Sequence, residues 1–232
     1  MSLIKVLGIS GSPRRGATDH SVREALKAAA TVPGVETRSI SLAGKTIKPC
    51  VNCDYCVRNK KLCRIKDDMA DLYESIVWAD AYIIGSPVYN MTISGPLQTF
   101  FNRWRPLHHV YKGLLENRVA GAIAVGGSRN GGQELTASAL VHTFLARGMV
   151  VVGGGSFDSY GGAYVVSHDR LAKGAEEDEI GMDSTRRLGR RVAQLAAWLK
   201  SGRGDEPVAA PSPSFAGSAG SKDGEKDGGA TS

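Results

Sequence analysis

Short apolar runs alternate with segments of helical periodicity, and this alternation is the strongest constraint on the fold of the chain. The runs cover residues 3–10, 35–42, 81–85, 118–126 and 149–153. Short and largely continuous apolar runs are typical of strands that are buried on both faces of a parallel sheet. The sequence therefore predicts an α/β fold with a doubly wound, five-stranded parallel sheet. In such folds, ligands bind at the carboxyl ends of the strands.

Helical spacing of apolar residues predicts the segments that cover this sheet. The expected helices are residues 20–30, the segment that follows Asp67 and Asp68, and residues 95–107, 133–147 and 183–200. The two aspartates suit a helix start because carboxylates offset the positive end of the helix dipole. Residues 157–181 are glycine-rich and charged, and we expect a surface loop there.

The domain organisation follows from composition. Residues 1–200 are expected to form one domain, which includes a cysteine-rich loop at 45–66. Residues 201–232 are rich in Gly, Ser, Pro and Ala. Such a segment cannot bury enough apolar area to offset the entropy of ordering, so a disordered tail is predicted.

Several classes of protein are disfavoured by the sequence. No apolar run approaches the roughly 20 residues of a membrane-spanning helix, so no membrane contact is expected. Lys5 interrupts the first apolar run, which argues against a secretory signal and for a cytoplasmic location. The net charge of +6 permits anionic partners. The arginines of the last helix fit its solvent face, so no nucleic-acid partner is expected.

The loop after the first apolar run is rich in small and hydroxyl-bearing residues. Small residues let backbone N–H groups approach an anion at a helix N-terminus, and hydroxyl and guanidinium groups add further donors. The loop lacks the Lys-Ser/Thr ending of a P-loop and the Gly-x-Gly-x-x-Gly spacing of a dinucleotide site. It therefore predicts a site for a terminal phosphate such as that of FMN. The candidate phosphate ligands are Ser10, Ser12, Arg14 and Thr18.

Two more loops fall at the same predicted end of the sheet. The loop after the third run offers a flat apolar face beside polar donors, as a flavin ring requires. Its candidate residues are Pro87, Val88, Tyr89 and Asn90. The glycine-rich loop after the fourth run allows close backbone approach to a planar ligand. Its candidate residues are Gly127, Ser128, Arg129, Gly131 and Gly132. Together the three loops favour a mononucleotide flavin pocket.

All the cysteines lie in one C-x2-C-x2-C-x6-C run, formed by Cys50, Cys53, Cys56 and Cys63. Cysteines spaced by two residues let a tight loop wrap a small inorganic core, which favours a [4Fe-4S] cluster. Zinc is the main rival, but four-cysteine zinc sites usually join two C-x2-C pairs through a longer spacer. A third interpretation is that the cysteines form a redox-active pair or are inert thiols. A disulfide framework is disfavoured because the cytosol is reducing.

The three loops resemble those of the flavodoxin-like NADPH-dependent FMN reductase family. The likeness rests on Gly-Ser-Pro-Arg at 11–14, Ser-Pro-Val-Tyr at 86–89 and the loop at 126–134, and it extends to about residue 200. It implies a flavodoxin-like sheet of strand order 2-1-3-4-5 with FMN bound in the three loops. Ala17 departs from the pattern, because many relatives have Asn at this position.

The cysteine run looks like that of the iron-sulfur flavoprotein branch of the same family. In that branch, the matching cysteines hold a [4Fe-4S] cluster, and the chains form homodimers or homotetramers. The resemblance implies that the cysteines at 50, 53, 56 and 63 are metal ligands. It also implies that the cluster lies near a flavin, either in the same subunit or in its neighbour.

Three functions are consistent with these features. The favoured one is an iron-sulfur flavoprotein that moves electrons from a ferredoxin-like donor, through the cluster and FMN, to a small acceptor. The second is an NAD(P)H-dependent FMN or quinone reductase with zinc-bound or redox cysteines. The third is a non-enzymatic flavodoxin-like electron carrier. No general acid or base is assigned, because the chemistry belongs to the cofactors.

Basic residues flank the cysteine ligands in the sequence. They are Arg58, Lys60, Lys61, Arg64 and Lys66. Because ferredoxins are typically acidic, these residues predict a docking surface for the electron donor. The alternative is a solvated basic loop that offsets the thiolate charge.

Overall fold

The computed structural model describes residues 3–202, and the predicted tail lies outside the described residues except for its first two. The strands are β1 (Ile4–Ser10), β2 (Val35–Ser41), β3 (Ala81–Pro87), β4 (Val119–Gly126), β5 (Val150–Val152) and β6 (Ala163–Val166). All strand pairs are parallel, in the order β2-β1-β3-β4-β5. The predicted fold class and strand order are therefore confirmed.

The sheet of residues 3–202 also contains a short sixth strand, β6, which was not predicted. β5 pairs with the first part of β4, from Val119 to Gly121, and β6 pairs with its last part, from Ile123 to Gly126. The interpretation of residues 157–181 as a surface loop was wrong, because β6, a short helix and the start of the last helix lie there. Three of the four residues of β6 are buried.

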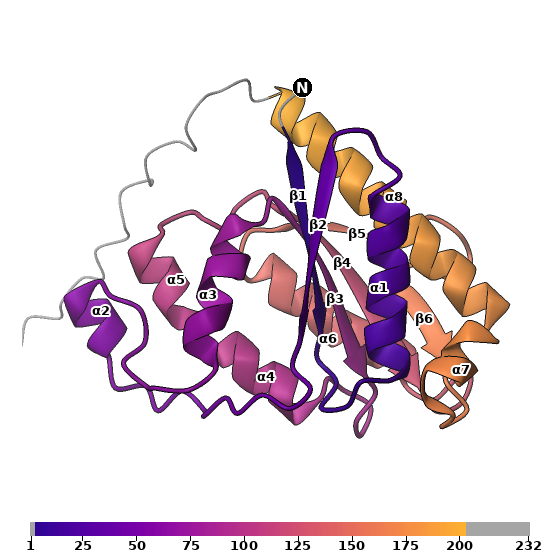
Figure 1. Cartoon of the computed structure of the whole chain (residues 1–232), viewed down its shortest axis with the longest axis horizontal. Helices are drawn as coiled ribbons and strands as arrows, with labels where there is room; N and C mark the ends of the chain where they lie inside the picture. The colour runs from indigo at the N-terminus through magenta and orange to yellow at the C-terminus, as the bar shows by residue number, and fades with distance from the viewer. Residues whose placement is uncertain (1–2, 203–232) are drawn as a thin grey trace, which may run out of the picture.

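Helices cover both faces of the sheet (Figure 1). The helices are α1 (Ala17–Ala29), α2 (Tyr55–Asn59), α3 (Met69–Trp78), α4 (Gly95–Asn102), α5 (Arg105–Val110), α6 (Gln133–Leu145), α7 (Leu171–Glu176) and α8 (Glu179–Gly202). Residues of α1 and α8 pack on one face of the sheet. Residues of α3, α4, α5 and α6 pack on the other. The structure is thus a three-layer α/β sandwich.

The helix predicted at 95–107 is divided in two. Ser94 is the N-cap of α4, its side chain accepts from the Leu97 N–H, and α4 ends at Asn102. α5 then starts with Pro106 in its first turn, where the missing proline N–H costs nothing. The break leaves Arg103 between the two helices, and its side chain is 1% exposed. α8 also differs from the expectation, because it begins four residues earlier than predicted.

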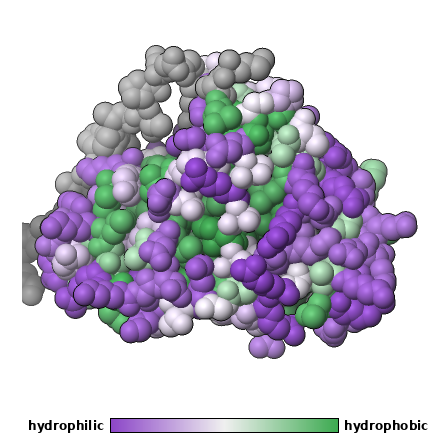
Figure 2. Space-filling model, in the orientation of Figure 1, coloured by the Kyte–Doolittle hydropathy of each residue, from purple (hydrophilic) through white to green (hydrophobic). Residues whose placement is uncertain are grey.

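The face shown in Figure 2 has hydrophilic residues toward both ends, including the part where α1 and α8 lie, and apolar residues along its middle. No helix among residues 3–202 combines the length and apolar character that crossing a membrane requires.

Candidate functional site

The cysteine-rich loop connects β2 to α3 and brings its four thiols to one cavity. Cys50, Cys53, Cys56 and Cys63 all line this cavity, together with Arg64, Arg103 and Arg105. All four are free thiols, and Cys56 is buried in α2. Among residues 3–202, no three Cys, His, Asp or Glu side chains are placed to hold a single metal ion. The four predicted metal ligands thus line one cavity, but their side chains do not converge on a single point.

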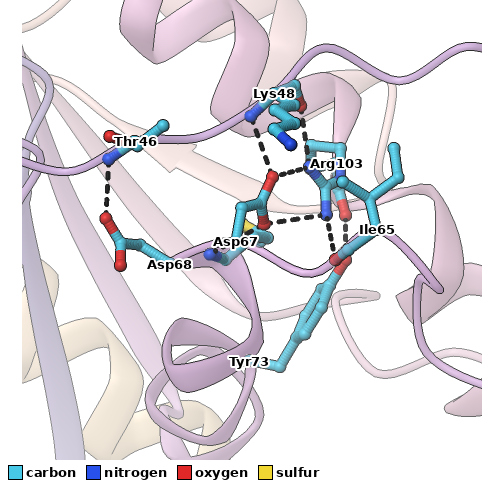
Figure 3. Close-up of polar contacts among 8 residues, drawn as sticks. Thr46, Lys48, Ile65, Asp67, Asp68, Tyr73 and Arg103 are labelled. Atoms are coloured by element: carbon cyan, nitrogen blue, oxygen red, sulfur yellow. Dashed lines mark hydrogen bonds and ion pairs between the residues drawn. The ribbon is translucent and has the colours of Figure 1, made fainter.

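A buried ion pair fastens both ends of the cysteine loop to the break between α4 and α5 (Figure 3). Arg103 Nη1 donates to Asp67 Oδ2 at 2.6 Å, and Nη2 donates to Asp67 Oδ1 at 3.1 Å. Both side chains are at most 2% exposed. The guanidinium also donates to the carbonyls of Lys48 and Ile65, at 2.7 and 3.5 Å. Because these carbonyls lie just outside the first and last cysteines, Arg103 holds the loop closed.

Further hydrogen bonds complete this anchor. The Lys48 N–H donates to Asp67 Oδ2 at 2.8 Å, and the Tyr73 hydroxyl of α3 donates to the Arg103 carbonyl at 2.7 Å. Asp68 accepts from the Thr46 N–H at 2.6 Å. Burial opposes ionisation of Asp67, but the hydrogen bonds from Arg103 and from two backbone amides outweigh it and hold the Asp67 pKa below its usual value. The anchor is thus ionic at neutral pH.

The thiols have different electrostatic surroundings. A hydrogen bond from the Tyr55 backbone lowers the pKa of the Cys53 thiol, and the nearby Arg64 acts in the same direction. Burial raises the pKa of the Cys56 thiol, against the effect of Arg105. Arg103 Nε is buried and has no hydrogen-bond partner in the described part of the chain. The lining of the cavity therefore carries positive charge, and one of its arginines has a buried N–H that is unpaired among residues 3–202.

The second candidate site is a cavity at the carboxyl ends of β1, β3 and β4. Of the predicted flavin residues, those that line it are Ser12, Arg14, Thr18, Pro87, Val88, Tyr89 and Gly127. They come from all three of the predicted loops. The hydroxyl and guanidinium side chains of the first loop therefore share a cavity with the Pro-Val-Tyr segment of the second.

Buried hydrogen bonds hold these loops in place. The Ser94 hydroxyl donates to the Gly11 carbonyl at 2.6 Å, and the Ser94 N–H donates to the Ser86 hydroxyl at 3.0 Å. The first and second loops are thereby joined. In the third loop, Gln133 donates to the Ser128 carbonyl at 2.7 Å and accepts from the Gly131 N–H at 2.8 Å. Gln133 is 2% exposed, so it fixes the glycine-rich loop from below.

Several predicted flavin residues do not line this cavity. They are Ser10, Asn90, Ser128, Arg129, Gly131 and Gly132. Ser10 is buried, and its hydroxyl has no partner in the described part of the chain. The Arg129 guanidinium instead donates to Asp178 at 2.6 Å, and the Asp178 side chain is 4% exposed. Gly132 adopts a φ of 98° and lies against Met91, where a side chain would collide.

Sequence reasoning missed a fourth loop, which follows β6. Ser167, Asp169 and Leu171 line the cavity from this side. Leu171 approaches Gly16, and the Asp169 carboxylate approaches Gly127. The available signal was the apolar run at 163–166, which is followed by polar residues just as the longer strands are. Because the run has only four residues, it did not stand out from its glycine-rich surroundings.

The two cavities have no lining residue in common. The cysteine cavity is beside α2 and α5, which lie together at one end of the molecule (Figure 1). The second cavity includes residues of α1 and α7, which lie toward the other end.

Comparison with known proteins gives a consistent family match. A sequence model of the NADPH-dependent FMN reductase family matches residues 4–161. An iron-sulfur flavoprotein of Methanocaldococcus jannaschii is 43% identical over 201 residues, which are 87% of this chain and all of that protein. An iron-sulfur flavoprotein of Archaeoglobus fulgidus is 42% identical over 190 residues, which are 82% of this chain and 96% of that protein.

A solved structure supports the fold. RosB, in complex with 8-demethyl-8-formylriboflavin-5'-phosphate, aligns with a TM-score of 0.68. The alignment covers 99% of both chains at 17% sequence identity. At that identity, the similarity concerns the backbone architecture alone.

Proposed function

Because this chain belongs to the iron-sulfur flavoprotein branch of the NADPH-dependent FMN reductase family, we propose that it transfers electrons between a one-electron donor, a [4Fe-4S] cluster, FMN and a small acceptor. It is a flavin-dependent oxidoreductase. FMN exchanges two electrons and can release them singly, whereas an iron-sulfur cluster exchanges one at a time, so the pair would convert between the two kinds of partner.

The observation that carries this proposal is the cavity that the four thiols share with an unpartnered donor. A four-cysteine cluster is anionic overall, so a fitting site needs positive charge and hydrogen-bond donors near its sulfur atoms. Arg64, Arg103 and Arg105 line the cavity. The buried Nε–H of Arg103 has no partner in the described part of the chain. The charge of this lining therefore suits an anionic cluster, and Cys50, Cys53, Cys56 and Cys63 are its proposed ligands.

We propose that flavin mononucleotide binds at the second cavity. Ser12, Arg14 and Thr18 would hold the phosphate, and Tyr89 with Pro87 offers a flat surface for the ring. Asp169 is an acidic residue of the lining, so Arg14 has to offset its charge when the phosphate binds. The exposed Asn90, Ser128 and Arg129, with Ser10, Gly131 and Gly132, remain proposed contacts at the edges of the site.

We place the electron route between subunits. Because the two cavities lie toward different ends of one chain, the cluster of one subunit would face the FMN of another in a homodimer or homotetramer. The chain's own task is to bind and orient the two cofactors. We also propose a cytoplasmic location, because four cysteines without a disulfide suit a reducing compartment.

The donor is proposed to be a ferredoxin-like protein that docks on the basic residues of the cysteine loop. Arg58, Lys60, Lys61, Arg64 and Lys66 are all exposed. The family description favours NAD(P)H as a second candidate donor. The family assignment does not favour the third function, a carrier without enzyme activity.

Charge reversal tests the docking surface. In the Lys61→Glu/Lys66→Glu variant, the rate of flavin reduction by reduced ferredoxin should fall about tenfold at low salt, because electrostatic attraction speeds association. The rate should also lose most of its salt dependence. Anaerobic stopped-flow absorbance at several salt concentrations measures both quantities.

The matched control is Lys27→Glu/Arg191→Glu, which reverses the same number of charges on α1 and α8, on the other side of the molecule. Its rate of reduction by ferredoxin should stay near that of the wild type. Equal rates and equal salt dependence in both variants and the wild type would exclude the proposed surface. Rapid reduction by NADPH with none by ferredoxin would favour the nicotinamide donor.

A further inference from the structure

A cavity of about 560 Å³ lies apart from the proposed flavin site. It is formed by α5, the segment 111–116 and the end of α6, just before β4 and β5 begin. It is therefore near the amino ends of these strands, whereas the flavin loops lie at the carboxyl ends. Its volume falls within the roughly 300 to 1,000 Å³ of small-molecule sites.

The lining combines positive charge with apolar surface. The basic residues are Arg105, His108, His109 and Arg147, and the acidic residue is Glu116. The apolar side chains are Trp104, Leu107, Leu114 and Leu115, with Tyr111 beside them. Such a lining matches a molecule that has a negatively charged group and an apolar body.

Arg147 lacks an acidic partner among residues 3–202. Its guanidinium donates to the carbonyls of Thr143 and Phe101, at 2.6 and 3.3 Å. It also lies over the rings of Phe101 and Trp104, 5.4 and 5.6 Å from their centres. Burial lowers the pKa of Arg147, and no neighbouring carboxylate opposes this effect. A partly buried cation without a counter-ion is costly, and a bound anion would remove that cost.

Trp104 has an unpaired donor within residues 3–202. Its side chain lines the same cavity and is 2% exposed, and its indole N–H has no partner in the described residues. A buried N–H that is left unpaired costs about 1–3 kcal/mol. In the part of the chain that the structure describes, a cation without an acidic partner and an unpaired indole N–H therefore both belong to residues that line one cavity.

We propose that this cavity binds a small aromatic carboxylate or sulfonate. The anionic group would pair with Arg147 and accept from the Trp104 N–H, and the ring would pack on Leu114 and Leu115. Arg105 lines both this cavity and the cysteine cavity, so the ligand would lie next to the cysteine loop. Binding at this cavity is a proposal separate from the proposed electron transfer, and it does not depend on it.

Binding of 8-anilino-1-naphthalenesulfonate to the purified full-length protein tests the site. The fluorescence titration should show one saturable site, and Arg147→Gln should weaken binding at least tenfold, which is about 1.4 kcal/mol. Gln keeps a donor for the Thr143 carbonyl but removes the charge. The uncharged analogue N-phenyl-1-naphthylamine should bind more weakly than the sulfonate to the wild type and equally to both proteins.

Two further variants keep the test decisive. Leu114→Trp fills the cavity without touching Arg147 and should also weaken binding of the sulfonate. Arg190→Gln, on α8, removes an arginine that lines none of these cavities and should leave binding unchanged. The absence of saturable binding in the wild type would refute the site, and so would wild-type affinity in both cavity variants.

Discussion

Asp67→Asn should lower the free energy of unfolding by about 3–5 kcal/mol, because it leaves the Arg103 charge buried without its partner. The ends of the cysteine loop should also separate, since Asp67 joins Arg103 to the Lys48 N–H. Urea unfolding of the cofactor-free protein measures the first effect. Iron retention by the reconstituted protein measures the second.

Asp68→Asn is the matched control for this prediction. Asp68 is adjacent in sequence and also accepts a backbone N–H, from Thr46, but it makes no ion pair with Arg103. Asn keeps an oxygen that can accept this N–H, so the substitution weakens a single hydrogen bond and should cost no more than about 1 kcal/mol. Equal losses of stability in the two variants would contradict the special role of the buried ion pair.

The effect of Asp67→Asn should depend on pH in a defined direction. The folded-state pKa of Asp67 lies below its ordinary value of 3.8. The ion pair therefore contributes fully above that value, and its contribution is lost as the pH falls through the lower folded-state pKa. The difference in stability between wild type and variant should be largest near neutral pH and should shrink below about pH 4.

Cys53→Ala should abolish the cluster and leave FMN binding intact. The cluster needs thiolate ligands, and Cys53 lines the cysteine cavity but not the flavin cavity. Iron and sulfide per chain should fall close to zero, whereas flavin per chain should equal that of the wild type. Reduction of the flavin by ferredoxin should be lost with the iron.

Val51→Ala is the control for this variant, because it shortens an exposed side chain of the same loop without removing a thiol. It should keep its full content of iron and flavin. Full iron content in Cys53→Ala would refute the ligand assignment. Loss of FMN together with the iron would contradict the separation of the two sites.

The elements that could be predicted are those whose sequence pattern alone sets their structure. β1, β3 and β4 are almost entirely buried. Because buried strands need apolar residues on both faces, their apolar runs could be recognised in the sequence. The cysteine spacing likewise placed four thiols in one loop. β6 was missed because its run is short, and the division between α4 and α5 was missed because helical periodicity continues across it.

The contacts that position the sites depend on tertiary packing and have no local signal. Asp67 and Arg103 are 36 residues apart in the sequence, and nothing near either one indicates the other. Arg129 was assigned to the flavin from its place in a glycine-rich loop. In the structure, its guanidinium binds Asp178, which lies just before α8. Sequence reasoning therefore located the loops but not the partners of their side chains.

Anaerobic purification, followed by analysis of metal, sulfide and flavin, tests the central claim most directly. We expect about four iron and four sulfide per chain, as a [4Fe-4S] cluster requires, together with one FMN. A broad brown absorbance should accompany the flavin bands. One zinc per chain, without iron or sulfide, would contradict the proposed cluster and favour a reductase with zinc-bound cysteines.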